Sequence, residues 1–193
     1  ISSCIISAPA SGLLSVAMVV MHGAGFLAVK IERGAVLDRA RRIGSVAAIA
    51  SLVLFAAGGL WVANGAMGFR LEGVVDPNGP SNPLFVKAVA APGAWIDNYG
   101  RYPWMLIAPI LGLAGPVIAL LGIRRHSHVL NLAGSSLATV GIIATVGLSM
   151  FPFILPSSID PQSSLTAWNA SSSHLTLWIM LIVTLIFLPL VLA

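Results

Sequence analysis

The sequence has 193 residues, of which 58% are hydrophobic and 8% are charged. A water-soluble domain carries about a quarter charged residues, so this composition excludes one and predicts an integral membrane protein. The net charge of +4 reflects ten basic against six acidic residues. Because no basic stripe is interleaved with aromatic residues, nucleic-acid binding is not predicted.

Five apolar stretches are long enough to cross the hydrocarbon layer of a bilayer, which takes roughly 20 residues in a helix. None of them contains Asp, Glu, Lys or Arg. The runs are continuous rather than alternating, which favours helices over barrel strands. The predicted fold class is therefore all-α, a polytopic transmembrane helix bundle forming a single domain. In chain order the predicted spans cover residues 11–29, 43–67, 103–123, 129–155 and 174–193.

The connections between these spans alternate between basic and non-basic. Residues 30–42 carry five Lys or Arg, and residues 124–128 carry two Arg and two His. Residues 68–102 hold three basic residues, balanced by three acids, and residues 156–173 hold no Lys or Arg. Because cytoplasmic loops are enriched in Lys and Arg, we predict that 30–42 and 124–128 are cytoplasmic. The loops 68–102 and 156–173 are predicted to face outward.

The first predicted span places a histidine beside methionines, in the stretch MVVMHG. Met18 and His22 are four residues apart and share a helix face, and both residue types ligate haem in cytochromes. Two roles stay open for His22, a haem ligand or a hydrogen bond across a helix contact, and the second is favoured. His126 and His128 have no third ligand nearby in the sequence, so no metal site is predicted there.

Small residues are dense in the second, third and fourth spans, for example GLAGP at 112–116 and AGSSLATVG at 133–141. In lipid, such residues let helices approach closely. They could also mark the broken helices of a secondary transporter. Transporters usually keep ionisable residues at membrane depth, and the predicted spans have no Asp, Glu, Lys or Arg, so close packing is favoured.

The stretch FPFILPSSIDPQSSLTAWNASSSHLTLW follows the fourth span. Its prolines at 152, 156 and 161 prevent a helix from continuing, and Ser171 to Ser173 are candidates for the N-cap of the last span. Aromatic residues near the outer span ends are predicted to form an interfacial belt. These are Trp95, Tyr99, Tyr102, Trp104 and Trp168.

Taken together, MFPFILPSS and SLTAWNASSSHLTL resemble subunit II of bacterial cytochrome bd-type quinol oxidases, including the cyanide-insensitive variety. Upstream, MHGAGFLAVKIERGAVLDRARR is similar to that subunit's His-Gly-containing helix and basic loop, and SNPLFVKAVAAPGAWIDNY to its outward loop. Asn169 stands where the family often has Asp, so no titrating role is expected there. The outer motif is carried by Phe151, Pro152, Pro156, Ser157, Ser158, Trp168, Ser171 and Ser172.

The chain starts at Ile1 rather than Met, and we interpret it as part of a longer membrane protein. The resemblance implies the C-terminal portion of subunit II, with the last five of about nine helices, in a bacterial inner membrane. It implies a heterodimer with subunit I, which carries haems b and d and oxidises quinol while oxygen is reduced to water. The family also admits a small accessory subunit and a bound quinone. No catalytic residue or metal is assigned to this chain. The alternative is a fragment of a secondary transporter with a midplane solute site.

Overall fold

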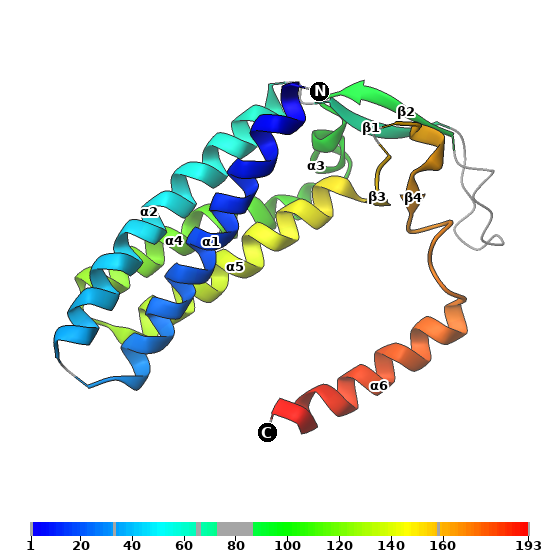
Figure 1. Ribbon diagram of the computed structural model, residues 1–193. Helices are drawn as coiled ribbons and strands as arrows, with labels where there is room; N and C mark the ends of the chain where they lie inside the picture. Colours follow the sequence, from blue (N-terminus) through cyan, green and yellow to red (C-terminus); the bar gives the residue numbers. More distant parts are fainter. Residues whose placement is uncertain (1, 33, 65–66, 73–86, 158, 193) are drawn as a thin grey trace. The chain divides into compact units, whose positions relative to one another are not determined.

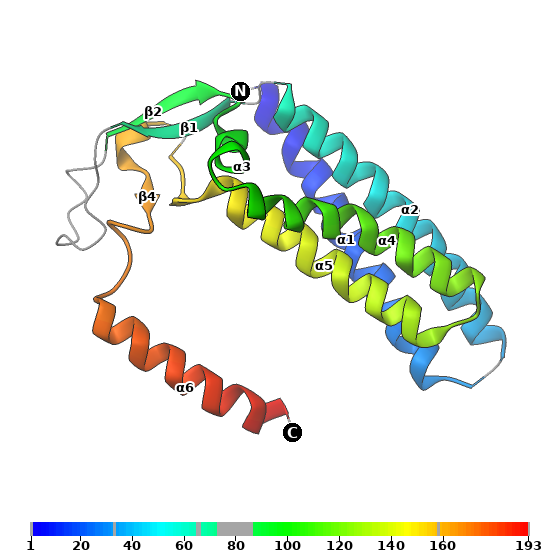
Figure 2. The same ribbon diagram turned by 180° about the vertical axis from the view of Figure 1, so that it is seen from behind.

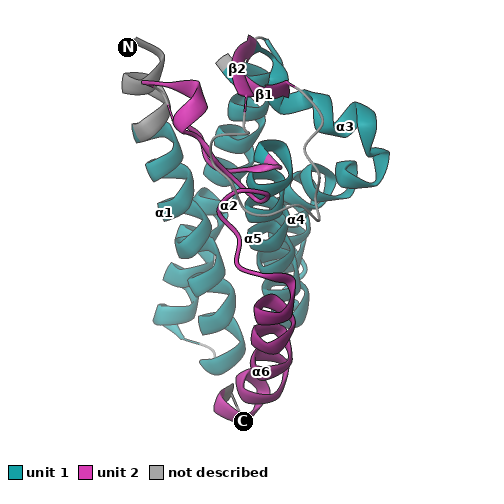
Figure 3. Ribbon diagram, turned by 90° about the vertical axis from the view of Figure 1, so that its right-hand side faces the viewer, with its two compact units in different colours: residues 1–68, 92–150 teal, residues 69–91, 151–193 magenta. Residues whose placement is uncertain are grey.

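The computed structural model describes residues 2–32, 34–64, 67–72, 87–157 and 159–192. They fall into two compact units, here called unit 1 (residues 1–68 and 92–150) and unit 2 (residues 69–91 and 151–193) (Figure 3). In the described part of the chain, five helices are long and apolar enough to cross a membrane. The predicted fold class, an all-α polytopic membrane protein, is confirmed.

Unit 1 is a bundle of four long helices, α1 (Ser2–Lys30), α2 (Ala35–Ala63), α4 (Ile107–Arg124) and α5 (His128–Met150) (Figure 1). Helix α1 packs against α2 and α5, and α4 packs against α5 and α2, so the four form a closed ring of contacts. The short elements η2 (Ala94–Ile96), α3 (Asp97–Arg101) and η3 (Pro103–Leu106) lead into α4.

The antiparallel pair of α4 and α5 lies side by side along its length (Figure 2). A Cβ atom on Gly115, Gly122, Gly134 or Gly141 would collide with the backbone of the facing helix. The facing residues are Ala138, Asn131, Ala119 and Gly112. Successive contact positions are three, four and three residues apart on both helices, which is the spacing of a single helix face. The small residues therefore serve close packing, as the sequence predicted.

The centre of the bundle is lined by Met21 and by alanines, namely Ala47, Ala48, Ala119 and Ala138. Most larger apolar side chains of the four helices are exposed instead. In a bilayer this distribution is expected, since lipid tails solvate apolar side chains as well as a protein core does.

The turn between α4 and α5 is held by hydrogen bonds at the end of α4 and at the start of α5. Ser127 N–H donates to Gly122 O at 2.9 Å and His126 N–H donates to Ile123 O at 3.2 Å, while His126 has a φ of 55°. This is a Schellman motif with His126 in the left-handed position. Ser127 then caps the N-terminus of α5, because its Oγ accepts from Leu130 N–H at 3.4 Å.

Unit 2 contains short strands and one long helix. Strands β1 (Met67–Glu72) and β2 (Lys87–Pro92) form one two-stranded sheet. Strand β3 (Phe153–Leu155) pairs antiparallel with β4 (Leu165–Thr166), and η4 (Pro161–Ser163) lies between them. Helix α6 (His174–Leu192) is apolar and exposed over its described side chains.

The helix boundaries differ from the predicted spans. Helix α2 begins at Ala35, inside the stretch predicted as a loop, because Ala, Leu and Arg are good helix formers and hydropathy marks only the lipid-facing part. It ends at Ala63 rather than 67. Helix α5 ends at Met150 rather than 155, since a residue before Pro152 avoids helical conformation. The predicted loop 68–102 holds β2, α3 and most of β1.

Candidate functional site

His22 makes a hydrogen bond across a helix contact in unit 1. It is half-buried on α1, and its Nδ1 lies 3.1 Å from Oγ of Ser135 on α5. Ser135 is fully buried, and its hydroxyl donates to Leu132 O at 2.9 Å. Because a hydroxyl has one proton, Ser135 Oγ accepts from His22 Nδ1–H. In the neutral ring the lone pair therefore lies on Nε2.

Glycine allows α1 and α5 to approach at this point. A Cβ atom on Gly25, three residues after His22, would lie 3.0 Å from Ser135 Oγ and 3.4 Å from Leu132 Cα. A larger residue there would press against the acceptor of the histidine. Gly25 thus has a packing reason, and the cross-helix hydrogen bond that was one of the two predicted roles of His22 is present.

Met18, the other residue considered for haem, is half-buried one turn before His22 on the same helix. Among the described residues, no group of three or more His, Cys, Asp or Glu side chains could hold a metal ion. His126 is exposed and His128 half-buried at the start of α5. The haem role of His22 and Met18 stays a prediction, because a hydrogen bond at Nδ1 leaves Nε2 available.

The outer motif of unit 2 is closed by a buried polar turn. Asn169 Oδ1 accepts from Thr166 N–H at 2.6 Å and from Thr166 Oγ1 at 3.0 Å. Its Nδ2 donates to Ser164 O at 3.4 Å. Ser164, Thr166 and Asn169 are 1%, 0% and 9% exposed. An amide serves here because it both accepts and donates, whereas a carboxylate would face the Ser164 carbonyl without a proton.

The same segment is tied together at Ser157 and Asp160. Ser164 Oγ accepts from Ser157 N–H at 3.0 Å, which joins the two ends of the loop between β3 and β4. Asp160 caps η4, since its Oδ1 accepts from Gln162 N–H at 3.1 Å and its Oδ2 from Ser163 Oγ at 3.0 Å. These contacts satisfy backbone donors that a short loop would otherwise leave unpaired.

The other motif positions have packing or capping surroundings. Phe151 and Trp168 meet edge to face with ring centroids 5.9 Å apart. Pro152 O accepts from Ala167 N–H at 2.8 Å. Pro156 and Ser171 are half-buried and Ser172 is exposed. Ser158 lies outside the described residues.

Of the three candidate N-cap serines, Ser173 is the residue that caps α6. Its Oγ lies 3.4 Å from Thr176 N and 2.9 Å from Thr176 Oγ1. His174 opens this helix and stacks edge to face on Trp178, with centroids 6.3 Å apart. His174 is therefore a helix-terminal residue with an aromatic contact.

The sequence analysis did not predict the side-chain hydrogen bonds that Asn98 and Tyr99 make near the C-terminal end of α5. Asn98 Nδ2 donates to Leu148 O at 2.9 Å, and Tyr99 OH lies 2.7 Å from Ser149 Oγ and donates to Thr145 O at 3.2 Å. The last four carbonyls of a helix have no partner within it, so Asn98 satisfies one of them at Leu148, while Tyr99 adds a hydrogen bond one turn earlier, at Thr145. Tyr99 was predicted only as a belt aromatic. The signal in the sequence that could have indicated these hydrogen bonds is the polar stretch DNY, residues 97–99, which follows an apolar run.

Comparison with known proteins places these features in a family context. Residues 6–193 match the family model described as cytochrome bd terminal oxidase subunit II. Over 182 residues, 94% of the chain, it is 37% identical to the cytochrome bd-I ubiquinol oxidase subunit 2 of Escherichia coli strain K12. It is 33% identical over the same length to the probable cytochrome oxidase subunit 2 of Haemophilus influenzae. Each match covers 48% of the relative, so the chain spans about half of their length.

Proposed function

The chain belongs to the family of cytochrome bd terminal oxidase subunit II, and from this membership we propose that it is the C-terminal portion of subunit II of a respiratory quinol oxidase. The observation that carries this proposal is the family match, which covers nearly the whole chain. The complex oxidises quinol and reduces oxygen to water in a bacterial inner membrane. Its partner is subunit I, with which the full-length chain forms a heterodimer.

We assign haems b and d to the partner and no step of the reaction to this chain. The unit 1 bundle does not suit a haem in its interior, because Ala47, Ala48, Ala119 and Ala138 bring the helices into direct contact there. This close packing supports a chain that braces the complex rather than one that handles electrons. A bound quinone and a small accessory subunit are components that the family context suggests.

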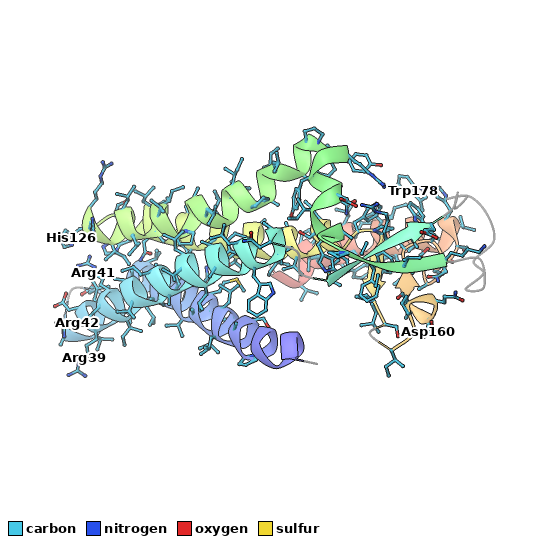
Figure 4. All side chains as sticks on the ribbon, turned by 90° about the horizontal axis from the view of Figure 1, so that it is seen from above. Arg39, Arg41, Arg42, His126, Asp160 and Trp178 are labelled. Atoms are coloured by element: carbon cyan, nitrogen blue, oxygen red, sulfur yellow. The ribbon has the colours of Figure 1, made fainter. Side chains whose placement is uncertain are left out.

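The orientation follows from the two basic segments. Both belong to unit 1, and Arg39, Arg41, Arg42 and His126 gather at one end of its helices (Figure 4). We propose that this end is cytoplasmic, since cytoplasmic segments are enriched in Lys and Arg. The secondary transporter is the weaker alternative, because the relatives named above are oxidase subunits.

Purification of the full-length chain from its native membrane in mild detergent tests the proposal. We expect a haem-bearing partner chain to co-purify and the complex to show the absorption bands of haems b and d. The His22→Ala variant should keep those bands. A chain that purifies without haem or partner would contradict the proposal. Haem that stays with this chain alone and disappears in His22→Ala would assign the ligand role to His22.

A further inference from the structure

One end of the unit 1 bundle is strongly basic. Among the described residues its cations are Lys30, Arg39, Arg41, Arg42, Arg124 and Arg125, contributed by the end of α1, the start of α2 and the end of α4 with the residue that follows it. We call this set the basic end. Arg39, Arg42, Arg124 and Arg125 are exposed and Arg41 is half-buried. Figure 4 shows Arg39, Arg41 and Arg42 at the same end as His126, which follows Arg125 in the turn.

The charge of the basic end is not offset by its own acids. Only Glu32 and Asp38 lie among these cations in the described segments, and both are exposed. Within the described residues of this end, no salt bridge joins either acid to an arginine. Lys30 instead lies over the ring of Phe26, with Nζ 5.9 Å from its centroid. The six cations and two acids of the described residues leave this end with a net charge of +4.

The arginines lie on helices and on a hydrogen-bonded turn rather than on an irregular loop. Arg124 is the last residue of α4, and the Schellman turn after it fixes Arg125 and His126. Arg39, Arg41 and Arg42 lie on the first two turns of α2. The two helix ends are adjacent, since a Cβ on Gly44 would lie 3.7 Å from Ile123 Cδ1. The arginines of α2 and those at the end of α4 therefore lie on adjacent helix ends.

Exposed apolar side chains lie directly beside these cations. On α2, Val36 is 58% and Ile43 is 55% exposed, and next to Arg124 and Arg125 Leu121 is 40% and Val129 is 75% exposed. A phospholipid likewise has a charged phosphate next to apolar acyl chains, and its headgroup lies where a membrane helix ends. Arginine matches phosphate because its planar fork forms two parallel hydrogen bonds.

We propose that the basic end binds the headgroups of anionic phospholipids, with phosphates held between the arginines of α2 and those that end α4. The adjoining apolar side chains contact the acyl chains of the same lipids. The inference does not depend on the reaction of the complex or on which face of the membrane this end occupies.

The test uses the purified complex containing the full-length chain, with phosphatidylglycerol and phosphatidylcholine as probes and native mass spectrometry as the measurement. We expect the wild type to bind phosphatidylglycerol more tightly than phosphatidylcholine. The double variant Arg42→Gln/Arg124→Gln should weaken phosphatidylglycerol binding by roughly tenfold or more, as expected for two cations near a lipid surface. Arg42→Lys/Arg124→Lys, which keeps the charge, should lose less.

Arg101→Gln is the matched control. Arg101 is exposed in α3, at the opposite end of unit 1 (Figure 1), so the variant should leave the phosphatidylglycerol affinity unchanged. Equal affinity in the wild type and in Arg42→Gln/Arg124→Gln would overturn the proposal. So would displacement of the lipid by an equal concentration of inorganic phosphate, which would indicate a site for free anions.

Two further outcomes also test whether the basic end binds lipid. If Arg42→Gln/Arg124→Gln keeps its lipid but loses a co-purifying polypeptide, the basic end binds an acidic protein and not lipid. If the variant does not assemble, the wild type alone is decisive, because electrostatic binding must weaken as salt is raised. A wild-type preference for phosphatidylglycerol that is absent, or that salt does not reduce, would overturn the proposal.

Discussion

Two serines of the unit 1 bundle, Ser51 and Ser135, are both fully buried but differ in their hydrogen bonding. Ser135 accepts from His22 and donates to Leu132 O. Ser51 Oγ has no hydrogen-bond partner among the described residues. Removing the Ser135 hydroxyl should therefore lower the free energy of unfolding, whereas removing the Ser51 hydroxyl should not.

We predict that Ser135→Ala destabilises the folded chain by about 1 kcal/mol, since it removes an interhelical hydrogen bond and leaves a histidine N–H unpaired. Ser51→Ala should leave the free energy of unfolding unchanged or raise it slightly, because an unpaired buried hydroxyl is itself unfavourable. Denaturant titration of the purified complex measures both. Equal destabilisation by the two substitutions would contradict this assignment.

Of the hydrogen bond between His22 and Ser135, only the role of His22 could be predicted from the sequence. Its place in an apolar helix favoured a cross-helix hydrogen bond, but the helical period gives only the face that a residue occupies, not the register against another helix. The partner Ser135 follows from the contact of Gly25 with Leu132 and Ser135. That contact depends on tertiary packing, which one sequence does not encode as a local pattern.

At the scale of elements, the contact between α4 and α5 depends on glycines at fixed positions. Gly134 faces the Ala119 backbone, where an added Cβ would collide, whereas an added Cβ on Gly147 of the same helix meets nothing within 4 Å. The two glycines thus separate the effect of packing from the effect of helix propensity.

We predict that Gly134→Val destabilises the chain by about 1–3 kcal/mol more than Gly147→Val, because it forces two helices apart. Both variants introduce the same β-branched residue into the same helix, so intrinsic propensity cancels. Thermal unfolding of the purified complex provides the comparison. A similar loss of stability in both would show that α4 and α5 do not depend on close contact.

The outer motif of unit 2 leads to a prediction about assembly. The segment from Ser157 to Ser164 is closed by the hydrogen bond between Ser157 N–H and Ser164 Oγ and leads into β4. The side chains of Ser157, Asp160 and Ser163 form hydrogen bonds within the segment, and no catalytic residue is assigned to it. We interpret the segment as an ordered cap that supports association with the partner subunit.

Deletion of residues 157–164 should accordingly reduce the amount of complex that co-purifies with the partner, while the complex that does form keeps its activity per haem. Quantitative co-purification and oxygen consumption per haem measure the two effects separately. The substitution Gln162→Ala, at an exposed position of the same segment, is the control and should change neither. A normal yield of complex in the deletion variant would argue against the cap.

For the whole molecule, the number of membrane-crossing helices could be predicted and their ends could not. Hydropathy reports which residues lipid surrounds, and the five predicted apolar runs correspond to five helices of the described residues that are long and apolar enough to cross a membrane. Helix ends are set by chemistry outside the hydrocarbon, such as the propensity of residues 35–42 and the proline at 152. Strands β3 and β4 were missed because runs as short as Phe153–Leu155 carry no periodic signal.

The predicted orientation of the chain depends on the basic end of unit 1 facing the cytoplasm. In a chain whose single native cysteine, Cys4, has been replaced by Ala, we propose single cysteines at Arg42, Arg124 and Gln162. Right-side-out membrane vesicles exclude an impermeant maleimide from the cytoplasmic face. We expect labelling at position 162 in intact vesicles, and at 42 and 124 only after permeabilisation.

The expectation has a physical reason, because several arginines at one end make translocation of that end unfavourable. Arg42 and Arg124 lie at adjacent helix ends of one unit, so they must be labelled together whichever side they occupy. Labelling of both in intact vesicles would reverse the orientation but keep the bundle. Labelling of one without the other would contradict the antiparallel packing of α2 against α4, and with it the arrangement of helices from which the lipid site was inferred.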